Sequence, residues 1–124
     1  AAKGKSAAYV YYFDYKTPMS PNGAGHAQEL AFVFGNPMMP GLPEMPKDQA
    51  LTAQFMGYWT NFAKTGDPNG PGLPHWPRYT LDRPQLMALG DKTGPIAVPE
   101  RDKLEVIDDY YAWRRMLADA AGQG

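Results

Sequence analysis

His26 is the residue of this sequence best placed to do chemistry. An imidazole group titrates near neutral pH, so a positioned histidine can take up a proton and return it within one reaction cycle. His26 follows Asn22, Gly23 and Gly25, which let a chain turn sharply at little steric cost, and it precedes an apolar run. A side chain at such a junction is aimed rigidly. A lone loop histidine is more often a surface or hydrogen-bonding residue, so spacing alone leaves both interpretations open.

The serines offer no nucleophile for this histidine. Ser6 and Ser20 are the only serines in the sequence. Ser6 stands in Gly4-x-Ser6-x-Ala8, close to the G-x-S-x-G pattern of a nucleophile elbow. That elbow joins a strand to a following helix, whereas Ser6 precedes a predicted strand. We therefore expect the nucleophile of any serine chemistry to lie outside these residues.

Glu29 and His75 are the remaining candidates. Glu29 lies three residues after His26, so the two side chains would share one helical face. They could be imagined as a metal pair, but two ligands without a third make a poor site, and a carboxylate that caps local amides is the simpler interpretation. His75 lies between prolines and is expected to be structural or exposed. The sequence predicts no metal and no cofactor.

The element that must position His26 is a strand predicted over residues 8–15, which are rich in aromatic side chains. Tyr11 and Phe13 share one face, and Val10 and Tyr12 share the other, so both faces are apolar. Such a strand typically lies inside a sheet that helices cover on both sides. No comparable strand follows it, so we expect its neighbours to come from outside these 124 residues. The chain is then the C-terminal part of a larger α/β protein.

The loop after this strand sets the place of His26. Residues 16–25 contain prolines and glycines and are predicted to form a loop. Ligand sites of open α/β sheets gather at the carboxyl ends of the strands. The order of strand, loop and histidine therefore puts His26 at that edge. The spacing of Leu30, Val33 and Phe34 predicts a short buried helix or turn directly after it.

Two long amphipathic helices are predicted. The first spans 47–64 and carries one apolar stripe, and Gly66 ends it. The second spans about 100–118 and follows Pro99. Between them, residues 85–89 and 95–98 could pair as a small hairpin, in which Pro95 limits its strand to an edge. The members of the first stripe are Leu51, Phe55, Tyr58, Trp59 and Phe62, and those of the second include Leu104, Ile107, Tyr111, Val106, Tyr110, Trp113 and Leu117.

The segment 35–46 contains four prolines and three methionines, and this density of proline excludes a helix. It is either a surface loop packed by its own methionines or an adaptable wall near a substrate cleft.

Composition narrows the class of protein. The formal net charge is −1 and the basic residues do not cluster, so nucleic acid is a poor partner. Cysteine is absent, which excludes a disulfide, a thiolate zinc site and a cysteine nucleophile. No apolar run approaches the length of a membrane span. Sixteen aromatic residues (Phe 5, Trp 3, Tyr 8) supply large apolar area and argue against general disorder.

Three motifs, which occur in the expected order, resemble one known family. Gly23-Ala-Gly-His26-x-x-Glu29-Leu30-x-Phe-Val-Phe-Gly35 resembles the catalytic-histidine segment of type B carboxylesterases, the family that includes the cholinesterases. Residues 58–69 (Tyr-Trp-Thr-Asn-Phe-Ala-Lys-Thr-Gly-Asp-Pro-Asn) and His75-Trp76-Pro77-x-Tyr79 resemble two further segments. The likeness covers roughly residues 8–117. Ala27 departs from the family pattern, which usually has glycine directly after the histidine.

The resemblance implies an α/β-hydrolase and a role for His26. The chain, residues 1–124, would be the C-terminal part of that fold, incomplete alone, with one central strand, the histidine loop, two amphipathic helices and a hairpin; residues 1–7 and 119–124 would be flexible. His26 would be the triad base that takes the proton of a serine and passes it to the leaving alcohol. The serine, the oxyanion hole and the triad acid would lie upstream, since α/β-hydrolases order their triad Ser, acid, His.

The implied partners are the N-terminal remainder of the esterase chain and a small-molecule carboxylic ester. Two alternatives remain open. One is a non-catalytic cholinesterase-like module that keeps the fold for binding or adhesion. The other is an independent small binding domain that uses the Pro/Met-rich segment, which the strand with two apolar faces disfavours.

Overall fold

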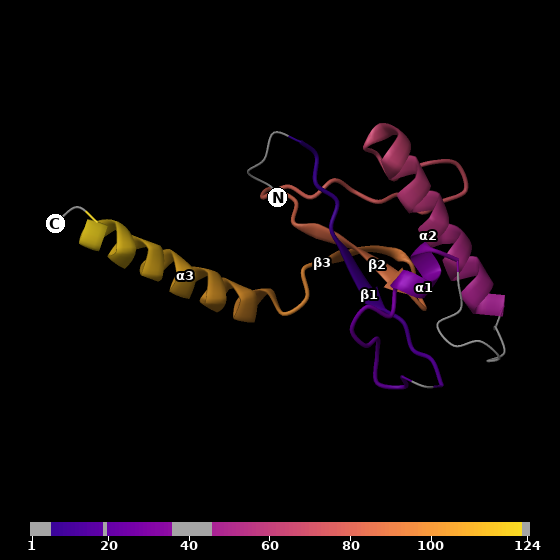
Figure 1. The fold of residues 1–124 in the computed structure, drawn as a ribbon, viewed down its shortest axis with the longest axis horizontal. Coiled ribbons are helices and arrows are strands. Elements are labelled where there is room, and N and C mark those ends of the chain that lie inside the picture. The colour runs from indigo at the N-terminus through magenta and orange to yellow at the C-terminus, as the bar shows by residue number, and fades with distance from the viewer. Residues whose placement is uncertain (1–5, 19, 36–45, 123–124) are drawn as a thin grey trace.

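The computed structural model describes residues 6–18, 20–35 and 46–122. Strands and helices are mixed along the chain, as an α/β protein requires. In chain order the elements are β1 (Tyr11–Asp14), α1 (Leu30–Val33), α2 (Pro46–Thr65), β2 (Gln85–Gly90), β3 (Gly94–Ala97) and α3 (Arg101–Gly122). The strands form one sheet in the order β1-β2-β3, with α1 and α2 beside it and α3 projecting away from it (Figure 1).

β1 confirms the predicted strand, although its ladder is shorter than residues 8–15. The side chains of Tyr11 and Phe13 pack on the core, as expected for one face. The opposite face is open, because Tyr12 is 45% exposed and the described helices cover one side of β1 only. The described residues therefore leave this second face of β1 uncovered, and the covering of both faces stays a prediction about the larger protein.

β2, and not β1, is the central strand of the described sheet. It pairs in parallel with β1 and antiparallel with β3. Leu86 and Met87 are neighbours in β2 and point to opposite faces, yet both are buried. The expectation that no comparable strand follows was wrong: residues 85–89 looked like half of a small hairpin, and periodicity cannot reveal a long-range parallel partner. The predicted hairpin itself is confirmed, with Pro95 on the edge strand β3.

α2 closes the core over one face of the sheet. It agrees with the predicted helix 47–64, and its buried residues are Leu51, Phe55 and Tyr58. Gly66 has a φ of 78° and donates its N–H to the carbonyl of Phe62, which ends the helix as predicted. The rings of α2 contact the rings of β1, for example Phe55 with Phe13 and Trp59 with Tyr11.

Trp76 joins the loop after α2 to β1. Its ring is 4% exposed and its indole N–H donates to the carbonyl of Val10. The Asn69 side chain accepts from the main-chain N–H of Trp76 at 2.6 Å and donates to its carbonyl at 2.9 Å. Tyr58 donates its hydroxyl to Pro74. The second and third motifs of the sequence therefore build the core together.

The two remaining helices differ from their predictions in burial. α1 forms where a short helix was predicted, but none of its residues is buried, and Leu30 is 48% exposed. α3 begins as predicted and continues past residue 118 to Gly122, four residues beyond the predicted end of the helix. Ala118, Ala120 and Ala121 favour this extension because alanine is the best helix former. The segment 36–45, which holds most of the Pro/Met-rich stretch, lies outside the described residues.

α3 buries no side chain. Its amphipathic pattern is as strong as predicted, but the apolar residues are all exposed, from 46% at Leu104 to 69% at Met116. In the described part of the chain, no helix is both long enough and apolar enough to cross a membrane.

Candidate functional site

His26 lies in the loop that leaves the carboxyl end of β1. Asp14, the last residue of β1, pairs with Gly90, the last residue of β2, so the two parallel strands end together. The loop that follows β1 carries His26 and leads into α1 (Figure 1). The predicted placement of this loop, at the carboxyl edge of a parallel sheet, agrees with the structure.

The loop is folded back on the strand it leaves. Thr17 and Ser20 exchange two main-chain hydrogen bonds of 3.3 and 3.0 Å. Gly23 has a φ of 124°, and a Cβ built there would come within 3.5 Å of Oδ1 of Asp14. A chain that turns twice within so few residues needs glycine at such a conformation.

Glu29 holds the far end of the loop. It accepts a hydrogen bond of 3.4 Å from the hydroxyl of Tyr11 in β1. Burial, followed by the charge of Glu29 and by this hydrogen bond, raises the pKa of Tyr11. Glu29 is thus bound to the sheet and does not cap local amides, which was the simpler interpretation.

Ala27 stands where the family pattern usually has glycine, and its backbone is left-handed. Its φ is 57°, in the left-handed region that glycine adopts freely and an L-residue adopts at a cost of roughly 1–2 kcal/mol. The turn directly after His26 is therefore strained in this chain.

His26 itself is exposed and makes no hydrogen bond or ion pair with any residue that the structure describes. It lines neither the cavity beside Tyr15 and Asp91 nor the cavity beside Gln85 and Ala97. Ser20, within the same loop, uses its main-chain groups in the turn with Thr17, and Ser6 is exposed before β1. His75 is exposed, in agreement with its prediction.

A polar cluster surrounds Lys16, the second residue after β1. Asp91, in the turn between β2 and β3, accepts from the main-chain N–H of Lys16 at 3.3 Å. The ammonium of Lys47, in the first turn of α2, lies 3.2 Å from Asp91 and donates to the carbonyl of Lys16 at 3.2 Å. The hydrogen bond from Lys47 lowers the pKa of Asp91.

The buried side chain of Tyr15 packs against this cluster. Tyr15 is 1% exposed, its hydroxyl bonds to Asp48, and the ammonium of Lys47 lies 4.7 Å from its ring centroid. Burial raises the pKa of Tyr15, as do the hydrogen bond and charge of Asp48. A shallow cavity of about 250 Å³ lies beside these groups.

Sequence reasoning missed this cluster. Asp48 was recognisable only as a charge suited to a helix start, and Asp91 only as part of a turn. No local pattern connects residues that are 31 and 75 positions apart.

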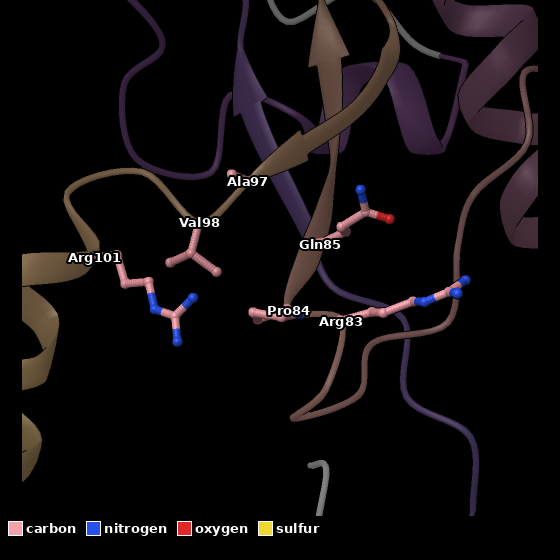
Figure 2. Close-up of a pocket in the computed structure, with 6 residues that line it drawn as sticks. All are labelled: Arg83, Pro84, Gln85, Ala97, Val98 and Arg101. Atoms are coloured by element: carbon pink, nitrogen blue, oxygen red, sulfur yellow. The ribbon is translucent and has the colours of Figure 1, made fainter.

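The second cavity lies at the opposite end of the sheet. It measures about 440 Å³ and is lined by Gln85, the first residue of β2, and Ala97, the last of β3. Figure 2 shows that the side chain of Arg83 extends away from that of Arg101, and Arg101 is paired with Glu105 at 2.8 Å. The arginines do not converge on one point, and the cavity holds no acid–base pair. Among the described residues, no three metal-ligating side chains come together.

Comparison with known proteins matches the sequence of this chain to one family. The model of the carboxylesterase family matches residues 1–106. Carboxylesterase 4A of Bos taurus is 41% identical over 100 residues, which are 77% of this chain and 18% of the relative. Acetylcholinesterase of Bungarus fasciatus is 38% identical over 102 residues, 77% of this chain and 16% of the relative.

A solved structure agrees with the sequence comparison. The crystal structure of a carboxylesterase of Geobacillus stearothermophilus is 38% identical, with a TM-score of 0.63, over 75% of this chain and 20% of the other. The chain thus spans about a fifth of the length of the relatives that it matches.

Proposed function

Because this chain belongs to the carboxylesterase family, we propose that it is the C-terminal portion of a serine carboxylic-ester hydrolase with an α/β-hydrolase fold. His26 is its general base. The observation that carries the proposal is the family match over residues 1–106, which includes the motif around His26. The chain spans about a fifth of its relatives, so the nucleophile, the oxyanion hole and the triad acid belong to the N-terminal portion.

In this proposal His26 moves one proton in each half of the reaction. It takes the proton of the serine hydroxyl as that oxygen attacks the ester carbonyl, and it gives the proton to the alkoxide that leaves. The acyl group remains on the serine until a water attacks its carbonyl and gives a proton to the same imidazole. The bond to the serine oxygen then breaks, that oxygen takes the proton from the imidazole, and the acid leaves. The substrate class is a small carboxylic ester.

The exposure of His26 supports this role. A general base must come within about 2.6–3.2 Å of the hydroxyl that it deprotonates. Because no described residue bonds to the ring, another segment can approach it. Glu29 is bound to Tyr11, which favours an acid from elsewhere as the group that orients the imidazole.

The exposed apolar surfaces of α3 and β1 support the proposal that the rest of the same protein packs against them. The whole of α3 and the open face of β1 leave large apolar side chains in solvent, including Tyr12, Tyr111 and Trp113. Surfaces of this kind mark interfaces. The remainder of the esterase chain is the partner that we propose for them, and this argues against an independent small domain.

The first test is an assay of the 124-residue chain with a nitrophenyl ester. We expect no turnover, because a base without a nucleophile cannot form the acyl intermediate. Turnover that His26→Ala abolishes would contradict the proposal, since the chain would then contain a complete site.

The second test uses the protein that includes the N-terminal portion. His26→Ala should lower kcat by a factor of about 10³ or more, as loss of a triad member does. His75→Ala is the matched control, because this second histidine is also exposed and lies outside the loop. A protein that binds esters yet is equally inactive with and without His26 would be the non-catalytic module.

A further inference from the structure

Both main-chain polar groups of Lys16 are bound by one ion pair. Asp91 accepts from its N–H at 3.3 Å, Lys47 donates to its carbonyl at 3.2 Å, and the two side chains lie 3.2 Å apart. Lys16 is the second residue after β1, where the chain must turn from the strand into the histidine loop. Three elements therefore meet at this point: the end of β1, the start of α2 and the turn between β2 and β3.

The neighbours of the pair restrict its movement. The ammonium of Lys47 lies over the buried ring of Tyr15. Gly90 precedes Asp91, and a Cβ at Gly90 would collide with the carbonyl oxygen of Asp14. The ends of β1 and β2 are thus in close contact. This contact fixes the main chain at Asp91, whose side chain binds Lys16.

The rest of the loop carries this constraint forward. The turn between Thr17 and Ser20 begins directly after Lys16, and Gly23 returns to the end of β1 beside Asp14. The second anchor is the contact between Glu29 and Tyr11. His26 lies between two fixed points and has no side-chain bond of its own with a described residue. The anchors, and not contacts of the ring, must then set where the imidazole lies.

We propose that Lys47 and Asp91 are positioning residues for His26, which fix the direction in which the chain leaves β1. This inference rests on the proposed function, because it assigns the pair a purpose only if His26 is the base. Neither residue touches the substrate. Their effect is on the fraction of time that the imidazole spends within reach of the serine hydroxyl.

The exposure of the pair separates this role from a structural one. Both side chains are 44% exposed, and ion pairs of that kind contribute little to folding. A change that removes the pair should therefore alter catalysis more than stability. A pair that held the fold together would do the reverse.

The experiment measures kcat, KM and melting temperature for variants of the protein that includes the N-terminal portion. Asp91→Ala and Lys47→Met should each lower kcat about tenfold and leave KM within about twofold, because geometry at the reacting atoms is lost and substrate binding is kept. Lys47→Arg should recover most of kcat, since it can still bridge to Asp91. The double variant should be no worse than either single one, because both act through Lys16.

Glu105→Gln is the matched control. It removes the exposed pair of Arg101 and Glu105 in α3, far along the chain from the loop, and should leave kcat unchanged. The positioning role is refuted if Asp91→Ala and Lys47→Met retain full kcat, or if kcat falls only together with a drop in melting temperature like that of a core variant. His26→Ala separates the two ideas: an active His26→Ala protein overturns the proposed function, whereas an inactive one with unaffected pair variants overturns this inference alone.

Discussion

α2 and α3 have similar lengths and similar amphipathic sequences, but they differ in burial. They contain 20 and 22 residues, and both carry an apolar stripe along one side. α2 buries Leu51, Phe55 and Tyr58 against the sheet, whereas α3 buries nothing. Figure 1 shows the first beside the strands and the second projecting from them. Amphipathic spacing thus predicts a helix and its apolar face. It does not show whether another part of the chain covers that face.

The difference has an energetic consequence for mutations. A large apolar side chain matters to the free energy of unfolding only where it is removed from water on folding. Equivalent substitutions in the two helices should therefore give very unequal results in the 124-residue chain. Three pairs of variants and one single variant test this difference between buried and exposed regions.

The largest effect is expected from Phe55→Ala. Phe55 is fully buried between the rings of Phe13, Phe32 and Trp59, so its truncation should cost about 3–5 kcal/mol of unfolding free energy. Trp113→Ala in α3 removes a bigger ring that is 55% exposed and should change stability by less than ~0.5 kcal/mol. Urea unfolding followed by far-ultraviolet circular dichroism measures both. Similar costs for the two variants would mean that α3 packs on the sheet.

The next effect concerns two glycines of the sheet. Gly90→Ala should cost about 1–3 kcal/mol, because its methyl group would collide with the main chain of Asp14 at the end of β1. Gly94→Ala in β3 meets nothing within 4 Å and should be neutral. The same unfolding measurement compares them. If Gly90→Ala is as stable as Gly94→Ala, the strand ends are not in the close contact described.

A third pair of variants compares tyrosines at high pH. Burial raises the pKa of Tyr58 from 10.0 to about 12. Its folded-state pKa is raised, so the stability it contributes is complete below pH ~10 and is lost as the pH rises through ~12. Tyr58→Phe should cost about 1 kcal/mol at neutral pH, through the lost bond to Pro74, and should flatten the alkaline decline.

Tyr110→Phe is the control for this titration, since Tyr110 is 50% exposed in α3 and should leave the alkaline curve unchanged. Stability is measured by urea unfolding between pH 8 and pH 12. A decline that is the same in both variants would assign it to groups other than Tyr58.

The smallest effect belongs to the surface of α3. Glu105→Gln removes the ion pair with Arg101, and exposed pairs at this helical spacing contribute ~0.3–0.5 kcal/mol. The helix content of α3, followed by circular dichroism at low and high salt, should fall slightly at low salt only. A large loss of cooperativity would mean that α3 depends on this pair and is not an independent helix.

Local patterns predicted much of the fold. The periodicity of residues 47–64 located α2 to within one residue at each end, and two short apolar runs separated by a turn with glycines located β2 and β3. The three motifs indicated the family that the comparisons identify. The triad role of His26 stays a prediction. What failed was the pairing of distant strands: β2 was predicted only as half of a small hairpin, and its parallel pairing with β1 was missed.

By itself the sequence determined where the helices and strands form and which side of each is apolar, because those properties depend on residues within a few positions of one another. Only the tertiary structure decided that β2 lies beside β1, that α2 is covered and α3 is not, and that Lys47 and Asp91 meet at Lys16. Lys47 and Asp91 lie 31 and 75 positions from Lys16, and no local spacing encodes contacts over such separations.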